Sequence, residues 1–176
     1  MPNRVTSRRP GLTPADVVAL DDLVPGGLHS SWLEFLLQAN VGVPERTWQH
    51  SGDLVVSHFL GVSPLAAEDF AATLARHKGG LAPRHVPIGR THQGHLLCMD
   101  AAGRIHAWDP DRHDRRRADP ALVEPPVRLA DSLQAFLADL SHPPHPPDLD
   151  PTEAVPIVTG EAFDALVREH RIDDEE

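Results

Sequence analysis

Closely spaced histidines are the residues of this chain best suited to metal chemistry. His92 and His95 are separated by two residues, as are His142 and His145, and imidazoles at short spacing are common ligands for transition metals. Neither pair has a convincing third ligand, and the chain contains no His-x-Glu-x-x-His, Cys-x-x-Cys or Gly-x-x-x-x-Gly-Lys motif. We therefore expect no metal site and no cofactor.

A second candidate is an acid–base cluster around Asp109, Asp111 and His113. Arg112 and the run Arg115–Arg117 interleave with these groups, a pattern typical of a solvated loop with local ion pairs. The arginines could contact phosphates, but no aromatic residue interrupts them and the net charge of the chain is −10, which disfavours nucleic-acid binding. No Gly-x-Ser-x-Gly elbow is present. The sequence predicts neither an enzyme nor a nucleic-acid-binding protein.

Aromatic and acidic residues are better candidates for binding a protein partner. Trp48 and Trp108 could form a binding floor, because aromatic side chains supply a large contact area at modest entropic cost. Burial in the core is the bland alternative for both tryptophans. The single cysteine, Cys98, lies within an apolar run and is expected to be a small buried hydrophobic residue.

The charge is divided unevenly along the chain. Residues 143–176 hold ten carboxylates and two arginines, whereas residues 1–142 hold sixteen acids and fourteen bases. The boundary is the proline-rich run His142–Pro147, which is typical of a semi-rigid polyproline spacer. The expected organisation is a flexible N-terminus at 1–12, a folded domain at 13–142, and a proline-linked acidic extension at 143–176. The extension supplies the candidate partner-binding residues Asp148, Asp150 and Glu153.

The element pattern predicts an α+β domain. Helices are expected to begin at Thr13, at Ser31 (spaced with Glu34 as a capping box), at Ser63–Pro64 and at Asp131–Ser132. Their apolar positions are Val17, Leu20 and Val24; Trp32, Phe35, Leu36 and Ala39, broadened by Leu33 and Leu37; Ala66, Phe70 and Leu74; and Leu133, Phe136, Leu137 and Leu140. Segregated helices and strands favour an antiparallel sheet packed with helices.

Strands are expected at Leu54–Leu60, after His85, and in a hairpin over residues 94–109. In that hairpin, Leu96–Met99 and Ile105–Trp108 flank the tight turn Asp100–Gly103. A charged loop should follow from Asp109 to Pro126. No apolar run approaches the roughly 20 residues that span a bilayer, and no signal peptide is recognisable at the start, so we expect a soluble cytoplasmic protein that does not enter a membrane.

Several short motifs follow one another in a characteristic order. They are Trp32–Asn40, His58–Leu60, Val86–Gly89, Gly94–Asp100, Gly103–Asp109 and Asp131–Leu137. Over roughly residues 13–140 this order resembles the SUKH superfamily of Smi/Knr-like domains. That family often has Asn-Gly-Gly after the second helix, where this chain has Asn40-Val41-Gly42. The proline spacer and the acidic extension lie beyond the family's usual body.

The resemblance implies an α+β fold and, for the large bacterial group of the family, an immunity protein that binds and neutralises a polymorphic toxin, often a nuclease or deaminase. An acidic inhibitor fits a nuclease because phosphate-binding clefts are basic. The sheet face or the Asp109–Pro126 loop is the expected contact region. The alternative is a regulatory protein-binding scaffold, as in the fungal members. The sequence leaves the toxin and the oligomeric state open.

Overall fold

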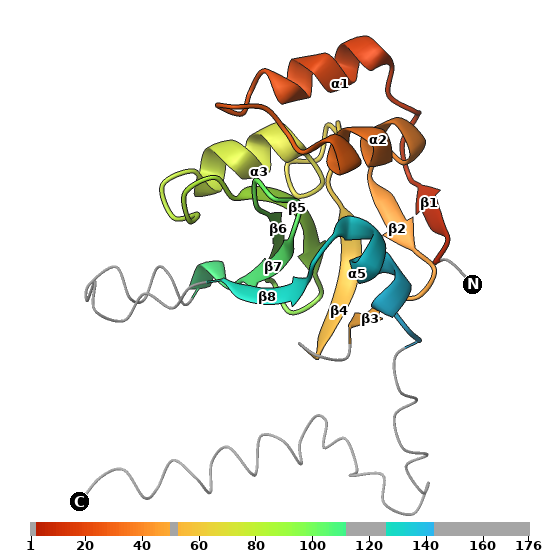
Figure 1. The fold of residues 1–176 in the computed structure, drawn as a ribbon. Helices are drawn as coiled ribbons and strands as arrows, with labels where there is room; N and C mark the ends of the chain where they lie inside the picture. Colours follow the sequence, from red (N-terminus) through yellow and green to blue (C-terminus); the bar gives the residue numbers. More distant parts are fainter. Residues whose placement is uncertain (1–2, 50–52, 112–125, 143–176) are drawn as a thin grey trace, which may run out of the picture. The chain divides into compact units, whose positions relative to one another are not determined.

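The computed structural model of the chain describes residues 3–49, 53–111 and 126–142. Within them lie four helices and eight strands (Figure 1). The helices are α1 (Pro14–Asp21), α2 (Ser30–Gln38), α3 (Phe70–His77) and α5 (Leu133–Asp139); the strands are β1 (Val5–Ser7), β2 (Gly42–Pro44), β3 (Trp48–Gln49), β4 (Leu54–Phe59), β5 (Val86–Thr91), β6 (Leu96–Met99), β7 (Ile105–Trp108) and β8 (Val127–Ala130). The predicted extension 143–176 and most of the Asp109–Pro126 loop lie outside the described residues.

All strand pairs are antiparallel, so the α+β class with an antiparallel sheet is confirmed. Strands β3 to β8 form one sheet in sequence order, and β1 pairs with β2 in a separate two-stranded sheet. The large sheet curls, with α5 lying between its two ends (Figure 1). Trp48 and Ser141 exchange two backbone hydrogen bonds of 2.9 Å, so the segment after α5 is joined to β3.

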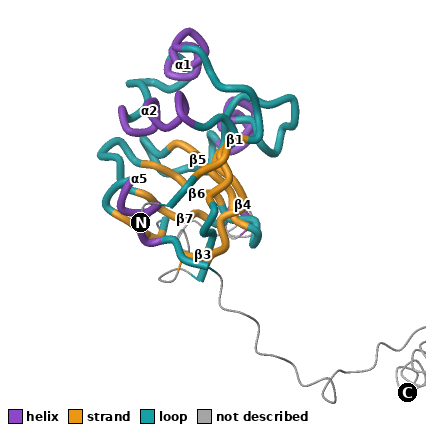
Figure 2. The backbone as a smooth tube through the Cα atoms, turned by 90° about the vertical axis from the view of Figure 1, so that its right-hand side faces the viewer, coloured by secondary structure: helices purple, strands orange, loops and turns teal. Residues whose placement is uncertain are grey.

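The core lies between the sheet and the helices. Four aromatic rings form its centre: Trp32 stacks on Phe35 at 5.0 Å, Phe35 meets Phe59 edge-on at 4.9 Å, and Phe59 contacts Phe136 at 6.5 Å. Figure 2 shows α1 and α2 together at one end of the strands. A smaller cluster of Leu96, Cys98 and Trp108 packs separately. Burial raises the pKa of the Cys98 thiol well above its usual range, in agreement with the expected hydrophobic role.

The predicted β6–β7 hairpin is confirmed, and one carboxylate organises its turn. Asp100 Oδ1 accepts the backbone N–H groups of Ala102 (2.9 Å) and Arg104 (3.0 Å), and Oδ2 accepts Arg104 Nε at 2.6 Å. Burial alone would raise the pKa of Asp100, but hydrogen bonds from Arg104, Ala102 and His106 outweigh it and hold the pKa well below its usual range. Gly103 closes the turn with a φ of 79°, which glycine adopts without strain.

Two of the four predicted helix starts are wrong in detail. Thr13 and Ser132 cap α1 and α5 as expected. The cap of α2 is His29, whose Nδ1 accepts the N–H of Ser31, so the Ser31–Glu34 capping box does not form. Helix α3 begins at Phe70 and not after Ser63, because the carboxylate of Asp69 accepts the N–H of Ala72 at 2.8 Å and aspartate is a strong N-cap.

Sequence patterns missed the shortest strands, β1, β2, β3 and β8, which have two to four residues each and therefore no readable alternation. Val5–Ser7 lies in the segment predicted to be flexible, yet it pairs with Gly42–Pro44 in β2.

Asn40 links β1 to the loop after β4. Its Nδ2 donates to the carbonyls of Pro10 (2.9 Å) and Val62 (3.2 Å), its Oδ1 accepts the N–H of Val62 (2.8 Å), and its backbone bonds to Ser7. The side chain is buried. A Cβ on Gly61 would lie 2.1 Å from Asn40 Oδ1, so this close approach requires glycine.

The next residue, Val41, is fully buried with a φ of 51°. A β-branched residue in the left-handed region is a steric outlier, and it stands where the family that the sequence resembles often has glycine.

We expect Val41→Gly to be more stable than Val41→Ala by about 1 kcal/mol, because both variants lose the buried side chain but only alanine keeps the unfavourable Cβ. Urea unfolding of the two variants measures the difference. Val56, fully buried on β4, is the control, and there alanine should be the more stable substitution by roughly 0.5–1 kcal/mol. Alanine proving more stable at both positions would contradict the role assigned to the Val41 backbone.

Candidate functional site

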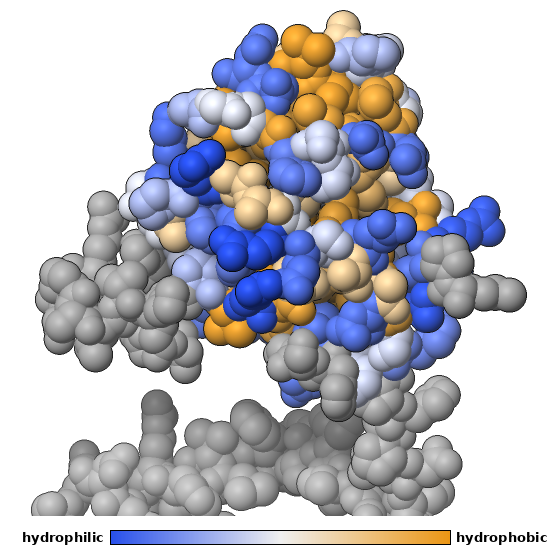
Figure 3. Space-filling view, in the orientation of Figure 1, coloured by the Kyte–Doolittle hydropathy of each residue, from blue (hydrophilic) through white to orange (hydrophobic). Residues whose placement is uncertain are grey.

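Helices α1 and α2 carry apolar side chains on their outer surface. Val18 is 59% exposed, Leu23 is 47% exposed and Leu37 is 45% exposed. Figure 3 shows apolar surface gathered over α1 and α2, at the top of the view. Exposed apolar side chains that gather over neighbouring elements mark interaction sites more often than isolated ones do. We call the exposed residues of Thr13–Gln38 the α1–α2 surface.

The helices are more apolar than their core contacts require. In α1, Val17 and Leu20 are buried while the adjacent Val18 faces outward. In α2, Leu36 is fully buried and the adjacent Leu37 is exposed, which corrects the expectation that Leu37 broadens the buried stripe. Neighbouring helical residues are about 100° apart around the axis, so one of each pair must leave the core.

The α1–α2 surface is also acidic. Between Thr13 and Gln38 the chain has four carboxylates and no lysine or arginine. Asp16 is used in the cap of α1, where hydrogen bonds from the backbone and side chain of Thr13 lower its pKa. Asp21 accepts the N–H of Leu28 at 2.5 Å. Asp22 and Glu34 are exposed, and neither has a side-chain hydrogen bond within the described part of the chain.

This combination suits protein binding. Apolar side chains gain free energy when a partner removes them from water, and carboxylates around them favour a basic partner and accelerate its approach. A surface of this kind supplies contacts and charge and needs no catalytic group.

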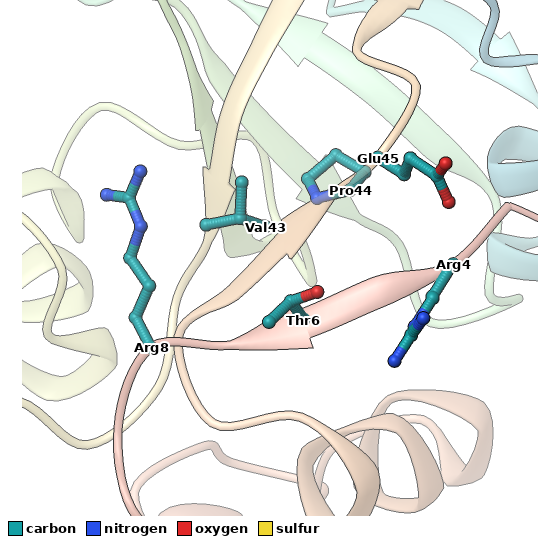
Figure 4. Close-up of a pocket in the computed structure, with 6 residues that line it drawn as sticks. All are labelled: Arg4, Thr6, Arg8, Val43, Pro44 and Glu45. Atoms are coloured by element: carbon teal, nitrogen blue, oxygen red, sulfur yellow. The ribbon is translucent and has the colours of Figure 1, made fainter.

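A cavity of about 520 Å³ lies beside the small sheet, lined by residues of β1 and β2 and their neighbours. Two of the lining residues, Arg4 and Arg8, are cationic, but Figure 4 shows their side chains pointing away from each other. Because the guanidinium groups do not converge, the cavity does not present a single anion-binding site.

The two predicted binding tryptophans lie in different parts of the large sheet. Trp48 is on β3 and Trp108 on β7, with β4, β5 and β6 between their strands. Trp48 is half-buried, and its Nε1 donates to Asp53 Oδ1 at 3.1 Å. Trp108 is only 8% exposed and meets the ring of His77 at 5.5 Å. The structure therefore does not join them in one binding floor.

Among the predicted acidic site residues, Asp109 and Asp111 lie together just after β7. Asp109 Oδ1 accepts the N–H of Asp111 at 3.0 Å, and Asp109 Oδ2 is 3.7 Å from His95 Nε2. His95 therefore faces a carboxylate, while His92 is exposed in the preceding turn. The other predicted partner-binding residues, Asp148, Asp150 and Glu153, lie outside the described residues.

Pattern reasoning did not single out the α1–α2 surface, because it read both helices as amphipathic elements facing the core. The available signal was the absence of lysine and arginine from Thr13 to Gln38. Together with apolar residues off the buried stripe, such as Val18, this absence could have indicated an interface.

No protein-family model, curated protein or solved structure matches the chain. In the part of the chain that the structure describes, no helix has the length and apolar character needed to cross a membrane.

Proposed function

We propose that this protein is a non-catalytic immunity protein of the Smi/Knr-like (SUKH) type, which binds and neutralises a cognate polymorphic toxin. The observation that carries the proposal is the acidic and apolar α1–α2 surface. We assign to this surface the contact with the toxin, in place of the sheet face or the Asp109–Pro126 loop expected from the sequence.

The core supports the family part of the proposal. The motifs on which the resemblance rests come from six segments, and each segment contributes a buried residue to the same core cluster. These residues include Trp32, Phe59, Ile88, Leu97, Ile105 and Phe136. A shared core built from the motif residues is what the resemblance implies.

The charge of the α1–α2 surface supports the partner part of the proposal. A toxin that acts on nucleic acid needs a basic cleft to hold phosphates, and such a cleft complements Asp22, Glu34 and their neighbours. Val18, Leu23 and Leu37 would form the apolar centre that sets the lifetime of the complex. Neutralisation then follows from covering the toxin's active surface.

We expect Leu37→Arg to weaken binding to the toxin domain encoded beside the gene by roughly 30-fold or more, the effect of a residue worth about 2 kcal/mol. Val18→Arg should act in the same direction. Calorimetric titration of the full chain measures the affinity, and loss of growth rescue on co-expression measures the consequence.

Leu65→Arg is the matched control, because Leu65 is 53% exposed and lies in the segment before α3. Unchanged affinity in all three variants would contradict the assigned surface but leave the immunity function standing. If the wild-type protein neither binds the folded toxin domain nor rescues growth, the immunity function itself is contradicted and the regulatory scaffold becomes the better proposal.

The acidic extension supplies a separate prediction. Deleting residues 143–176 removes ten carboxylates and two arginines, so it should slow association with a basic toxin and flatten the dependence of the association rate on salt. Stopped-flow association at two ionic strengths measures both. An unchanged rate and unchanged salt dependence would exclude steering by Asp148, Asp150 and Glu153.

A further inference from the structure

Three side chains from neighbouring strands meet beside the β6–β7 turn. They are His85, Asp100 and His106, and each is adjacent in sequence to a residue of one buried cross-strand row. That row is Val86, Met99 and Ile105. Because side chains alternate between the two faces of a sheet, the three polar residues share the face opposite the core.

The spacing of these groups suits a metal ion. One ligand atom of each residue lies within 4.8 Å of those of the other two. The rings of His85 and His106 have centroids 4.9 Å apart and are inclined at 72°. Two imidazoles on one tetrahedral Zn²⁺, with Zn–N bonds of roughly 2.0–2.1 Å, have ring centres about 5 Å apart. The two rings therefore already stand at the separation that a shared ion requires.

Hydrogen bonds assign the protons on both rings. Nδ1 of His85 lies 3.1 Å from the carbonyl oxygen of Pro83, which can only accept, so Nδ1 carries the proton and Nε2 keeps its lone pair. Nε2 of His106 lies 3.3 Å from Asp100 Oδ2, and this carboxylate also accepts. The lone pair of His106 is therefore on Nδ1.

His106 Nδ1 is an unpartnered buried atom. The side chain of His106 is 11% exposed, and Nδ1 has no hydrogen-bond partner among the described residues. A buried polar atom without a partner is unfavourable. A cation bound by the Nδ1 lone pair would remove that cost.

Asp100 is placed to orient His106. Its two oxygens already accept four hydrogen bonds, from the N–H of Ala102, the N–H and Nε of Arg104, and His106 Nε2. A carboxylate that accepts the N–H of a metal-binding histidine is the usual outer partner of such a ligand. The carbonyl of Pro83 has the same relation to His85.

We infer that His85 Nε2 and His106 Nδ1 bind a divalent transition-metal ion such as Zn²⁺, with Asp100 holding His106 in the binding tautomer. Imidazole ligands suit zinc, copper and nickel and do not suit magnesium or calcium. This site differs from both histidine pairs found in the sequence. It is independent of the proposed toxin binding.

Calorimetric titration of the full chain with Zn²⁺ tests the site. We expect one binding site in the wild-type protein that is lost in His85→Ala and in His106→Ala and weakened about tenfold in Asp100→Asn. The double variant His92→Asn, His95→Asn is the control and should keep the site. Excess Zn²⁺ should raise the melting temperature of the wild-type protein by about 5 °C, and Mg²⁺ should not.

His85 is half-buried and precedes β5, so its alanine variant decides the question if a substitution at His106 or Asp100 impairs folding. Nitrogen-15 spectra of the histidine rings provide a second readout, in which Zn²⁺ should shift His106 Nδ1. Equal Zn²⁺ affinity in the wild type and His85→Ala would overturn the inference, as would a wild-type protein that binds no Zn²⁺.

Discussion

The buried amide of Asn40 is the constraint on which the arrangement of helices and sheet depends. Its bonds to Pro10 and Val62 connect the segment that leads into α1 with the loop that follows β4, while its own backbone follows α2. Both helices of the α1–α2 surface are thus tied to the sheet at one point. Removing the amide would leave buried backbone groups of Pro10 and Val62 without partners, at a cost of about 1–3 kcal/mol each.

Carboxylates in this fold have two separate roles. Asp16, Asp21, Asp69 and Asp100 accept backbone N–H groups at helix caps and turns, so their charge is committed to local structure. Asp22 and Glu34 extend from the α1–α2 surface without such a role among the described contacts. A body of nearly balanced charge therefore has an acidic helical surface, which could favour a basic partner.

Sequence reasoning predicted the elements that have strong local signals. The capping box at Thr13, the cap at Ser132 and the Asp100–Gly103 turn depend on residues within four positions of one another, and all three are confirmed. Contacts between distant segments were not accessible in this way. The pairing of Val5 with Pro44, the clamp by Asn40 and the approach of His85 to His106 depend on how separate strands align, and no local pattern encodes them.

Hydrogen–deuterium exchange of the full chain, with and without the toxin domain encoded beside its gene, tests the central claim most directly. The account predicts that complex formation slows exchange of backbone amides in residues 14–38 and leaves β8 unchanged, although Val127 on that strand is also an exposed apolar residue. Protection confined to other segments would contradict the claim that α1 and α2 form the toxin-binding surface.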